Sequence, residues 1–511
     1  MPERETYGGK NMELKTALEK LKELEKISYA LRHAMGVLYV DGNTAAPKNS
    51  WRGRGETAAY LSELVYRQME NPETGEILDT ILSQQDQVDE KTWRQAELLK
   101  ESYDDIHLLP MEEYVGYRRL ITESESVWHE AKVNNDFASF APLLEKVIEF
   151  QKRIAVLKGK GEKPAYDVLL DQYEKGITMA ALDPFFAAVR EELTPLIREI
   201  AGKPGIGFDF QKHRWPIEQQ RKFSEKIMAL EGLNPDNCTL GETEHPFTDG
   251  FNKWDVRITT HYHEEDASYS MYSVLHEGGH ALYELGVDDE LQFSSLSGGV
   301  TMGIHESQSR FYENLIGRSR AFCKPLLAAL KECFPEQMTG VDEESLYQGI
   351  NRAQPSLIRT EADELTYPLH VMIRYEIEKR LIAGELKVSE LPQVWNEMYR
   401  KYLGIEVPDD RRGVLQDSHW SGGMFGYFPS YALGSAYGVQ MLRRMEKEID
   451  VWGSVEKGNL EPVTRWLGEK VHRYGSLKKP QEILSGALGG PFDLKVYTGY
   501  LKEKYGKLYG V

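Results

Sequence analysis

The sequence predicts a mainly α-helical protein, a single large helical body with a small β element near its middle. Apolar residues recur at spacings of three and four along most of the chain, the pattern of helices that bury one face. Alternation of apolar and polar residues, which would indicate strands, is scarce. Two helical lobes that face each other across a cleft are the alternative arrangement of the same helices.

The predicted elements follow this periodicity from residue 12 onward. The first helix carries an apolar stripe of Leu14, Leu18, Leu21, Leu24, Ile27 and Leu31 between Lys and Glu residues. The best strand candidate is Lys253 to Thr260 (KWDVRITT), and the polar stretches 159–164, 202–207 and 233–241 are short enough to be loops. The other predicted helices are Ala58 to Met69, Phe140 to Val156, Pro184 to Ile200, Ser307 to Cys333, Leu369 to Ile382 and Tyr431 to Ile449.

Composition excludes several classes of partner. The 511 residues carry 62 Lys and Arg against 81 Asp and Glu, a net charge of −19, which argues against nucleic acid or an anionic membrane as a partner. The charged N-terminus does not resemble a signal peptide, and no stretch is apolar enough to span a membrane. The three cysteines form no C-x-x-C pair, and Cys323 and Cys333 are expected to be buried structural thiols. We therefore expect a cytoplasmic protein.

One constellation of residues carries chemistry. Six of the 13 histidines fall between residues 245 and 305, and among them is His276-Glu277-Gly278-Gly279-His280. On a helix that Asp266 or Ser268 caps and Gly286 ends, His276 and His280 share one face and can bind one Zn²⁺. Glu277 then lies beside the open coordination position, where it can act as general base toward metal-activated water. The two glycines, costly inside a helix, suggest that something passes close to the backbone.

A catalytic zinc site needs a third protein ligand. The segment Gly303 to Arg310 begins a second amphipathic helix, and its Glu306, with 25 residues between it and His280, completes a His, His and Glu set. His305 is the competing ligand, but it would point about 100° away around the helix. Arg310, one turn further on, could orient Glu306 or form an ordinary ion pair within the helix.

Several further segments carry recognisable motifs in order. They are His245-Pro246-Phe247, Asp255 to Thr259 (DVRIT), the HESQSR stretch from His305, Ile358 to Leu365 (IRTEADEL) and Gly413 to Trp420 (GVLQDSHW), together with Tyr166 to Tyr173 (YDVLLDQY). With H-E-x-x-H they resemble the carboxypeptidase Taq family of metallocarboxypeptidases over roughly residues 160–435. The N-terminal third is looser: where the family usually has a Trp-Asp pair followed by Thr and Pro, this chain has Val40-Asp41, then Thr44 and Pro47.

The resemblance implies a zincin-like helical body with a deep central groove that admits the end of an unfolded peptide. It implies one catalytic domain over residues 1–511, with the N-terminal helices, about residues 12–110, as a lid over the groove. It further implies a homodimer that binds one Zn²⁺ per subunit, with Co²⁺ or Mn²⁺ as alternatives, and that removes C-terminal residues from peptides with broad specificity.

The resemblance also assigns roles to individual side chains. His419 and Tyr427 are expected to hold the oxyanion, with Tyr431 as the nearest rival to Tyr427. Arg359 is the first choice for binding the terminal carboxylate of the substrate, and Arg257 the second, because a guanidinium suits a bidentate contact. His245 and Asp255 are expected to line the cleft.

Two other functions fit the same residues. A gluzincin oligoendopeptidase would use identical metal chemistry on internal bonds, and a ladder of products shortened one residue at a time would distinguish the exopeptidase from it. A catalytically silent peptide-binding protein would keep the fold but lose hydrolysis, and the presence of Glu277 argues against that function.

Overall fold

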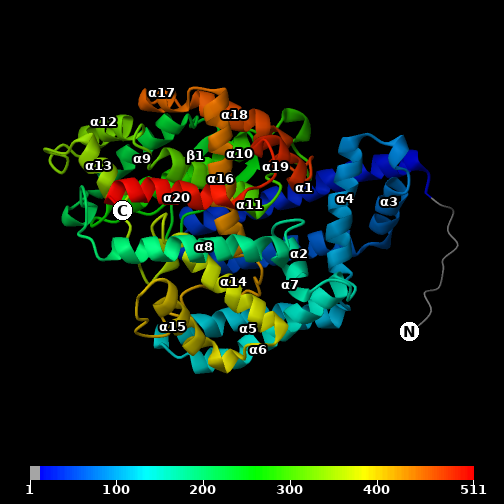
Figure 1. The fold of residues 1–511 in the computed structure, drawn as a ribbon. Coiled ribbons are helices and arrows are strands. Elements are labelled where there is room, and N and C mark those ends of the chain that lie inside the picture. The colour runs from blue at the N-terminus through cyan, green and yellow to red at the C-terminus, as the bar shows by residue number, and fades with distance from the viewer. Residues whose placement is uncertain (1–11) are drawn as a thin grey trace.

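The computed structural model describes residues 12–511, which form layers of packed helices around one small sheet (Figure 1). A lower layer in this view contains α5, α6, α7 and α15, and α14 joins it to the layer above (Figure 1). α8 runs along the boundary between these layers (Figure 1). The bounds are α5 Met111–Asn134, α6 Phe137–Lys158, α7 Ala165–Asp171, α8 Met179–Ala201, α14 Tyr367–Ala383 and α15 Leu391–Tyr402.

The upper layer contains the sheet and the helices packed around α10. The bounds of its long helices are α9 Ile217–Glu231, α10 Ala267–Leu285, α11 Met302–Arg310, α12 Cys323–Cys333, α16 Pro429–Glu448, α18 Glu461–Lys470 and α20 Leu494–Tyr509. The shorter elements are α13 Glu343–Ile350, α17 Val451–Glu456, α19 Pro480–Leu488, the π-helical segment η5 Phe311–Ile316, and the 3₁₀ turns η3 Phe210–Lys212, η4 Asp289–Leu291, η6 Arg359–Glu361, η7 Val388–Glu390 and η8 His472–Tyr474.

The first four helices have a hydrophobic core of their own, which includes Leu21, Leu78 and Leu99 and is separate from the main core. α3 and α4 project to one side of the body, while α1 extends from them across the upper layer (Figure 1). The main core is continuous from Ile121 to Tyr505 and draws on both layers. The bounds are α1 Leu14–Thr44, η1 Lys48–Ser50, α2 Trp51–Glu70, α3 Pro72–Leu82, η2 Gln85–Gln87 and α4 Glu90–Ile106.

The sheet has three strands in the order β1-β3-β2, with β1 parallel and β2 antiparallel to β3. The strands are β1 Cys238–Glu242, β2 Thr248–Asn252 and β3 Asp255–Thr260. Because side chains alternate between the two faces of a strand, Thr248 and Gly250 face α10, where they meet Glu277 and Glu284. Asp249 and Phe251 face α1 instead, close to Gly36.

The mainly α-helical class and the small β element are confirmed, and two details differ. The helix predicted over Ser307 to Cys333 is interrupted, because α11 passes into η5 and the chain then turns before α12 begins. The stretch 233–241, predicted as a loop, contains most of β1, whose polar residues alternate with buried Cys238 and half-buried Leu240.

Two other predictions concern thiols and membranes. Cys323 is buried as predicted, whereas Cys333 is only partly buried, and all three cysteines are unpaired. Within residues 12–511 no helix is both long and apolar enough to cross a bilayer. The absence of a signal peptide was predicted in part from residues 1–11, which lie outside the described residues.

Candidate metal centre

The H-E-x-x-H residues lie in the middle of α10, as their spacing predicts. The Asp266 side chain accepts a hydrogen bond from Ser268 N at 2.8 Å and caps the start of the helix, and Gly286 lies at its end. Val274, Leu275 and Ala281 anchor the opposite side of α10 in the core. The helix therefore presents its histidines from a rigid support.

Three ligand atoms converge on one point. Oε2 of Glu306, on α11, lies 3.6 Å from Nε2 of His276 and 3.5 Å from Nε2 of His280. Ligands about 2 Å from a tetrahedral zinc ion would be separated by about 3.3 Å, so the donor set and its spacing suit Zn²⁺. Among residues 12–511 these three form the only grouping of His, Cys, Asp and Glu compact enough for a metal ion.

Electrostatics prepare the ligands for a cation. Burial lowers the pKa of His280 to about 3, so its imidazole is neutral at neutral pH, the form that binds metal. Burial acts in the same direction on His276, but the carboxylates of Glu306 and Glu313 outweigh it and raise the pKa of that residue. Arg310 and the two histidines hold the pKa of the buried Glu306 carboxyl below its ordinary value.

The two glycines of the motif allow neighbouring helices to pack closely against α10. A Cβ at Gly279 would lie 2.5 Å from the carbonyl oxygen of Gln308, so Gly279 lets α11 approach α10 backbone to backbone. A Cβ at Gly278 would lie 2.2 Å from a carboxylate oxygen of Glu231. What passes close to the backbone is thus α11, which carries Glu306, and the end of α9.

Glu277 is buried beside the ligands and is held by the sheet. Thr248, on β2, donates a hydrogen bond to Oε2 of Glu277 at 2.6 Å. Burial raises the pKa of the Glu277 carboxyl, while His276 and the Thr248 hydroxyl act in the opposite direction. A raised pKa makes a carboxylate a better proton acceptor near neutral pH. Thr248 was not singled out from the sequence, although it directly follows the His-Pro-Phe motif.

A second carboxylate supports His276 from behind. Oε2 of Glu313, in η5, lies 2.8 Å from Nδ1 of His276, which leaves Nε2 free for a metal. Arg310 connects the two glutamates, with its Nε 2.8 Å from Glu306 and its Nη1 3.0 Å from Glu313. Glu313 was missed in the sequence. Its spacing of three residues from Arg310 predicts an ion pair on one helix face. The segment that carries it, η5, is π-helical, a geometry that often occurs at functional sites.

His305, the competing ligand, does not lie at the point of convergence. Its Nδ1 is 2.6 Å from Nδ1 of His280, and its Nε2 is 2.8 Å from Oε1 of Glu284. Both nitrogens of His305 are therefore engaged with other residues.

The predicted oxyanion residues form an aromatic cluster. His419 Nε2 lies 3.2 Å from the Tyr431 hydroxyl, and the Tyr427 ring lies 5.1 Å from the Tyr431 ring. A Cβ at Gly434 would lie 2.8 Å from Glu306 Cβ, so the helix that carries Tyr431 packs directly against the metal-site helix. Burial raises the pKa of Tyr427, and the charge of Glu306 adds to the rise, so its hydroxyl keeps its proton.

A buried carboxylate fixes the loop that carries His419 and Tyr427. Glu378, on α14, accepts hydrogen bonds from Trp420 Nε1 at 2.7 Å and from Gly426 N at 2.8 Å. The Tyr166 hydroxyl donates to the same carboxylate at 2.8 Å. Three buried donors on one carboxylate hold both ends of the loop against α14 and α7.

Arg359 is buried close to this cluster. Its Nη2 lies 2.9 Å from Asp417, its Nη1 donates to the Tyr367 hydroxyl at 3.0 Å, and its guanidinium lies 4.9 Å from the centre of the Tyr431 ring. Asp417 is shared with Arg374, at 2.6 Å. Because two guanidinium groups share one carboxylate, this trio retains a net positive charge next to Tyr431.

The other predicted substrate residues lie elsewhere. Arg257 pairs with Asp255 at 2.9 Å, on the face of the sheet that meets α1, not on the face that packs on α10. Arg257 also covers the Phe251 ring. His245 is exposed in the turn between β1 and β2. The structure thus does not bring Arg257, Asp255 or His245 together with the metal ligands.

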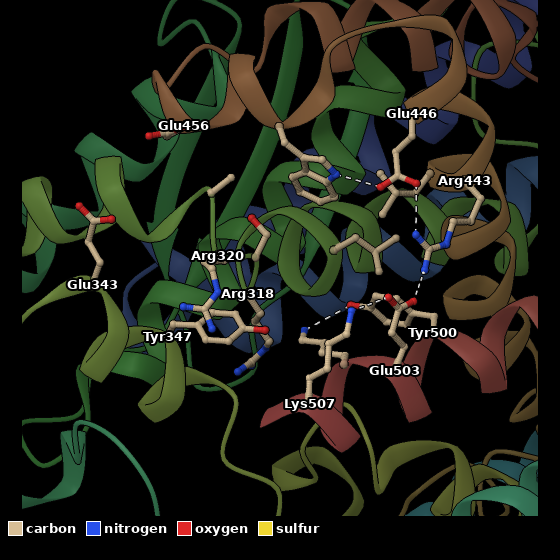
Figure 2. A pocket seen from close by; sticks show the side chains of 16 residues that line it. Arg318, Arg320, Glu343, Tyr347, Arg443, Glu446, Glu456, Tyr500, Glu503 and Lys507 are labelled. Atoms are coloured by element: carbon tan, nitrogen blue, oxygen red, sulfur yellow. Dashed lines mark hydrogen bonds and ion pairs between the residues drawn. The ribbon is translucent and has the colours of Figure 1, made fainter. Parts of the chain in front are cut away.

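A cavity of about 570 Å³ lies between α13, α16, α17 and α20 and contains none of the predicted site residues (Figure 2). Its cations are paired: Arg443 with Glu446 and Glu503, and Lys504 with Glu364. Arg320 pairs with Glu344 in the same way. The cavity therefore offers no unpaired cation among the described residues that would define an anionic ligand.

Comparison with known proteins gives the same family across the chain. Residues 20–505 match the model of the carboxypeptidase Taq (M32) metallopeptidase family. Carboxypeptidase 1 of Bacillus subtilis is 39% identical over 98% of this chain and 100% of its own length. Thermostable carboxypeptidase 1 of Thermus thermophilus is 34% identical over 97% of this chain and 99% of its own.

Solved structures agree with these sequences. The crystal structure of the M32 carboxypeptidase from Deinococcus radiodurans matches with a TM-score of 0.93 and 33% identity, over 97% of this chain and all of that one. A structure of the Pyrococcus furiosus carboxypeptidase matches with a TM-score of 0.91 and 34% identity, over 97% of this chain and 99% of that one. The chain belongs to the carboxypeptidase Taq (M32) metallopeptidase family and is a metal-dependent carboxypeptidase.

Proposed function

We propose that His276, His280 and Glu306 hold one Zn²⁺ per subunit, with Co²⁺ or Mn²⁺ able to occupy the same ligands. The observation that carries this proposal is the convergence of three possible ligand atoms, one from each residue, all within 4.8 Å of one another. The carboxylate oxygen of Glu306 lies within 3.6 Å of both imidazoles. When bound, a divalent metal there supplies Lewis acidity that polarises the scissile carbonyl and lowers the pKa of water.

Glu277 is proposed as the general base. Its carboxylate accepts a proton from the attacking water and passes it to the leaving amine, and the raised pKa that burial gives it suits a group that must both take and release a proton near neutral pH. The hydrogen bond from Thr248 keeps one oxygen in place, so the other is free for the transferred proton.

His419 and Tyr427 are proposed to donate hydrogen bonds to the developing oxyanion, with Tyr431 as the alternative to Tyr427. Burial lowers the pKa of His419 to about 4, so the imidazole is neutral and donates through whichever nitrogen carries the proton. Its Nε2 lies 3.2 Å from the Tyr431 hydroxyl, and its Nδ1 is buried without a hydrogen-bond partner among the described residues.

Arg359 is proposed to attract the terminal carboxylate of the peptide. The net positive charge that Arg359, Arg374 and Asp417 retain lies beside the oxyanion cluster, and the favoured substrate has its carboxylate one residue beyond the scissile bond. Arg257 is the weaker choice, because Asp255 neutralises it on the other face of the sheet.

The wider setting is also proposed. The separate core of α1–α4 suits a lid over a groove that admits the end of an unfolded peptide, in a single catalytic domain. His245 and Asp255 are proposed to line the outer part of that groove. The unpaired thiols suit the cytoplasm, and the family resemblance suggests a homodimer, which sedimentation would test.

The variant Glu277→Gln tests the mechanism. It keeps an oxygen for Thr248 but cannot accept a proton, so bound zinc should stay stoichiometric while kcat falls by about 100-fold or more. Mass spectra of a digested peptide should show a ladder of single-residue losses, and C-terminal amidation should block it. Full activity of the variant, or cleavage of internal bonds in the amidated peptide, would contradict the proposal.

A further inference from the structure

His305 occupies a close-fitting slot between two helices and a loop. A Cβ at Gly299 would lie 2.3 Å from Cδ2 of the His305 ring, so only glycine at this position lets the loop before α11 pass the ring. The Tyr283 ring lies 5.0 Å away, with its planes tilted. Packing alone therefore holds the His305 imidazole in one orientation.

The hydrogen bonds of His305 link His280 to a carboxylate. Nδ1 of His305 lies 2.6 Å from Nδ1 of His280, and Nε2 lies 2.8 Å from Oε1 of Glu284. The same Glu284 oxygen accepts a hydrogen bond from Gly299 N at 3.2 Å. Since Glu284 follows His280 by one turn of α10, His305 of α11 bridges two successive turns of the metal-binding helix.

Only one assignment of protons satisfies all of these contacts once Nε2 of His280 is a ligand. Nδ1 of His280 must then carry a proton and donate it to Nδ1 of His305. Nε2 of His305 must carry the other proton and donate it to Glu284. Each contact therefore fixes the tautomer of the next residue, and the carboxylate lies at the end of the chain, where it favours donation along its length.

We propose that His305 and Glu284 are positioning residues for the metal ligand His280, as a two-step relay of carboxylate, imidazole and ligand imidazole. The inference rests on the proposed ligand set of His276, His280 and Glu306. His276 has its carboxylate directly, from Glu313, whereas His280 reaches its own only through His305. The relay gives His305 a role other than that of a metal ligand in competition with Glu306.

The experiment measures Zn²⁺ affinity of the metal-free protein by competition with a chromophoric chelator. His305→Ala should weaken binding by about 10- to 100-fold, the range for lost partners of a ligand histidine. Glu284→Gln still accepts from His305 and from Gly299 but loses the charge, so it should weaken binding less. In the double variant with His305→Ala, the change Glu284→Gln should weaken Zn²⁺ binding by less than a further twofold, because His305→Ala has already broken the relay.

Three controls distinguish loss of the relay from loss of the fold or of a metal ligand. His263→Ala removes an exposed histidine outside the relay and should bind Zn²⁺ as the wild type does. His280→Ala should abolish tight binding, and retention of affinity there would overturn the ligand set itself. The melting temperatures of the metal-free variants should match the wild type within a few degrees. If His305→Ala folds poorly, the zinc affinity of Glu284→Gln still tests the relay.

The Co²⁺ form supplies a second readout. If His305 only positions His280, the visible absorption of the Co²⁺ protein should keep its intensity in His305→Ala, whereas loss of a ligand would change it. Zinc affinities of His305→Ala and Glu284→Gln within twofold of the wild type, with His280→Ala devoid of metal, would overturn the relay alone. The relay would also be overturned if the loss of zinc affinity in the double variant equalled the product of the losses in the two single variants.

Discussion

The Thr248 hydroxyl donates a hydrogen bond to the Oε2 atom of Glu277 over 2.6 Å, and it also lies 3.0 Å from the carbonyl oxygen of the same residue. Thr248 of the edge strand β2 therefore contacts the proposed general base at both its side chain and its backbone. This pair couples the small β element directly to the proposed general base.

Thr248→Val should reduce kcat about tenfold while zinc stays bound, because a hydrogen bond to a charged group is worth about 1.5–3 kcal/mol. The Thr248 hydroxyl lowers the pKa of Glu277, so its loss should raise that pKa. Since the base must be ionised, the acidic limb of the profile of kcat/KM against pH should move to higher pH. The control is Thr239→Val, at an exposed position of β1. An unmoved acidic limb in Thr248→Val would contradict the coupling.

Arg359→Lys should raise KM for peptides with a free C-terminus by about tenfold or more, because lysine keeps the charge but not the planar guanidinium that Asp417 and Tyr367 hold. Arg257→Lys is the matched control and should leave KM within about twofold. Steady-state kinetics on one peptide series measures the two variants. A larger effect at Arg257 than at Arg359 would reverse the proposed order of the two residues.

The sequence predicted that His276, His280 and Glu306 lie together and that the two histidines share one helix, because local rules determine the helix and its face. A spacing of four residues fixes a shared helix face, and Asp266 and Gly286 mark the ends of α10. Glu306 followed from the chemistry of the set. The partners that support these ligands could not be predicted in the same way, because Glu313, Glu284 and Thr248 meet them only through the packing of α10 against α11, η5 and β2.

Arg257 and Asp255 show what a sequence motif does not determine, which is the face of the sheet on which its side chains lie. Their motif predicted the right family and the right strand, but strand alternation alone does not say which face of a sheet meets the metal-binding helix. In the structure the buried Val256 and Ile258 take that face, and the charged pair meets α1. Similarly, the break in the helix predicted over Ser307 to Cys333 has no marker in its apolar periodicity.

Gly279→Ala should destabilise the fold by about 2–3 kcal/mol, because the new Cβ would lie 2.5 Å from a backbone oxygen and 2.7 Å from a backbone Cα of α11, neither of which can move independently. Gly116→Ala in α5 is the matched control, since its Cβ meets nothing within 4 Å and should stabilise by up to about 1 kcal/mol. Urea unfolding of the metal-free proteins measures both. Equal effects would show that helix propensity, not packing, decides the cost.

Glu231 ends α9 beneath Gly278, and neither of its buried carboxylate oxygens has a hydrogen-bond partner among the described residues. Burial raises its pKa well above the ordinary value of 4.5. Above pH 4.5 the unfolded chain releases this proton while the folded chain retains it, so the residue lowers stability progressively as pH rises, until the pH passes the pKa of the folded state.

Glu231→Gln removes that titration and keeps the shape of the side chain. Its stability relative to the wild type should therefore increase with pH, by up to about 1.4 kcal/mol per pH unit. Urea unfolding of the metal-free proteins at several pH values between about 5 and 8 measures the difference. Glu225→Gln, exposed on the same helix, should follow the wild type at every pH. If Glu231→Gln also follows the wild type, the Glu231 carboxyl is ionised in the folded protein, and the space beneath Gly278 must hold a partner for its charge.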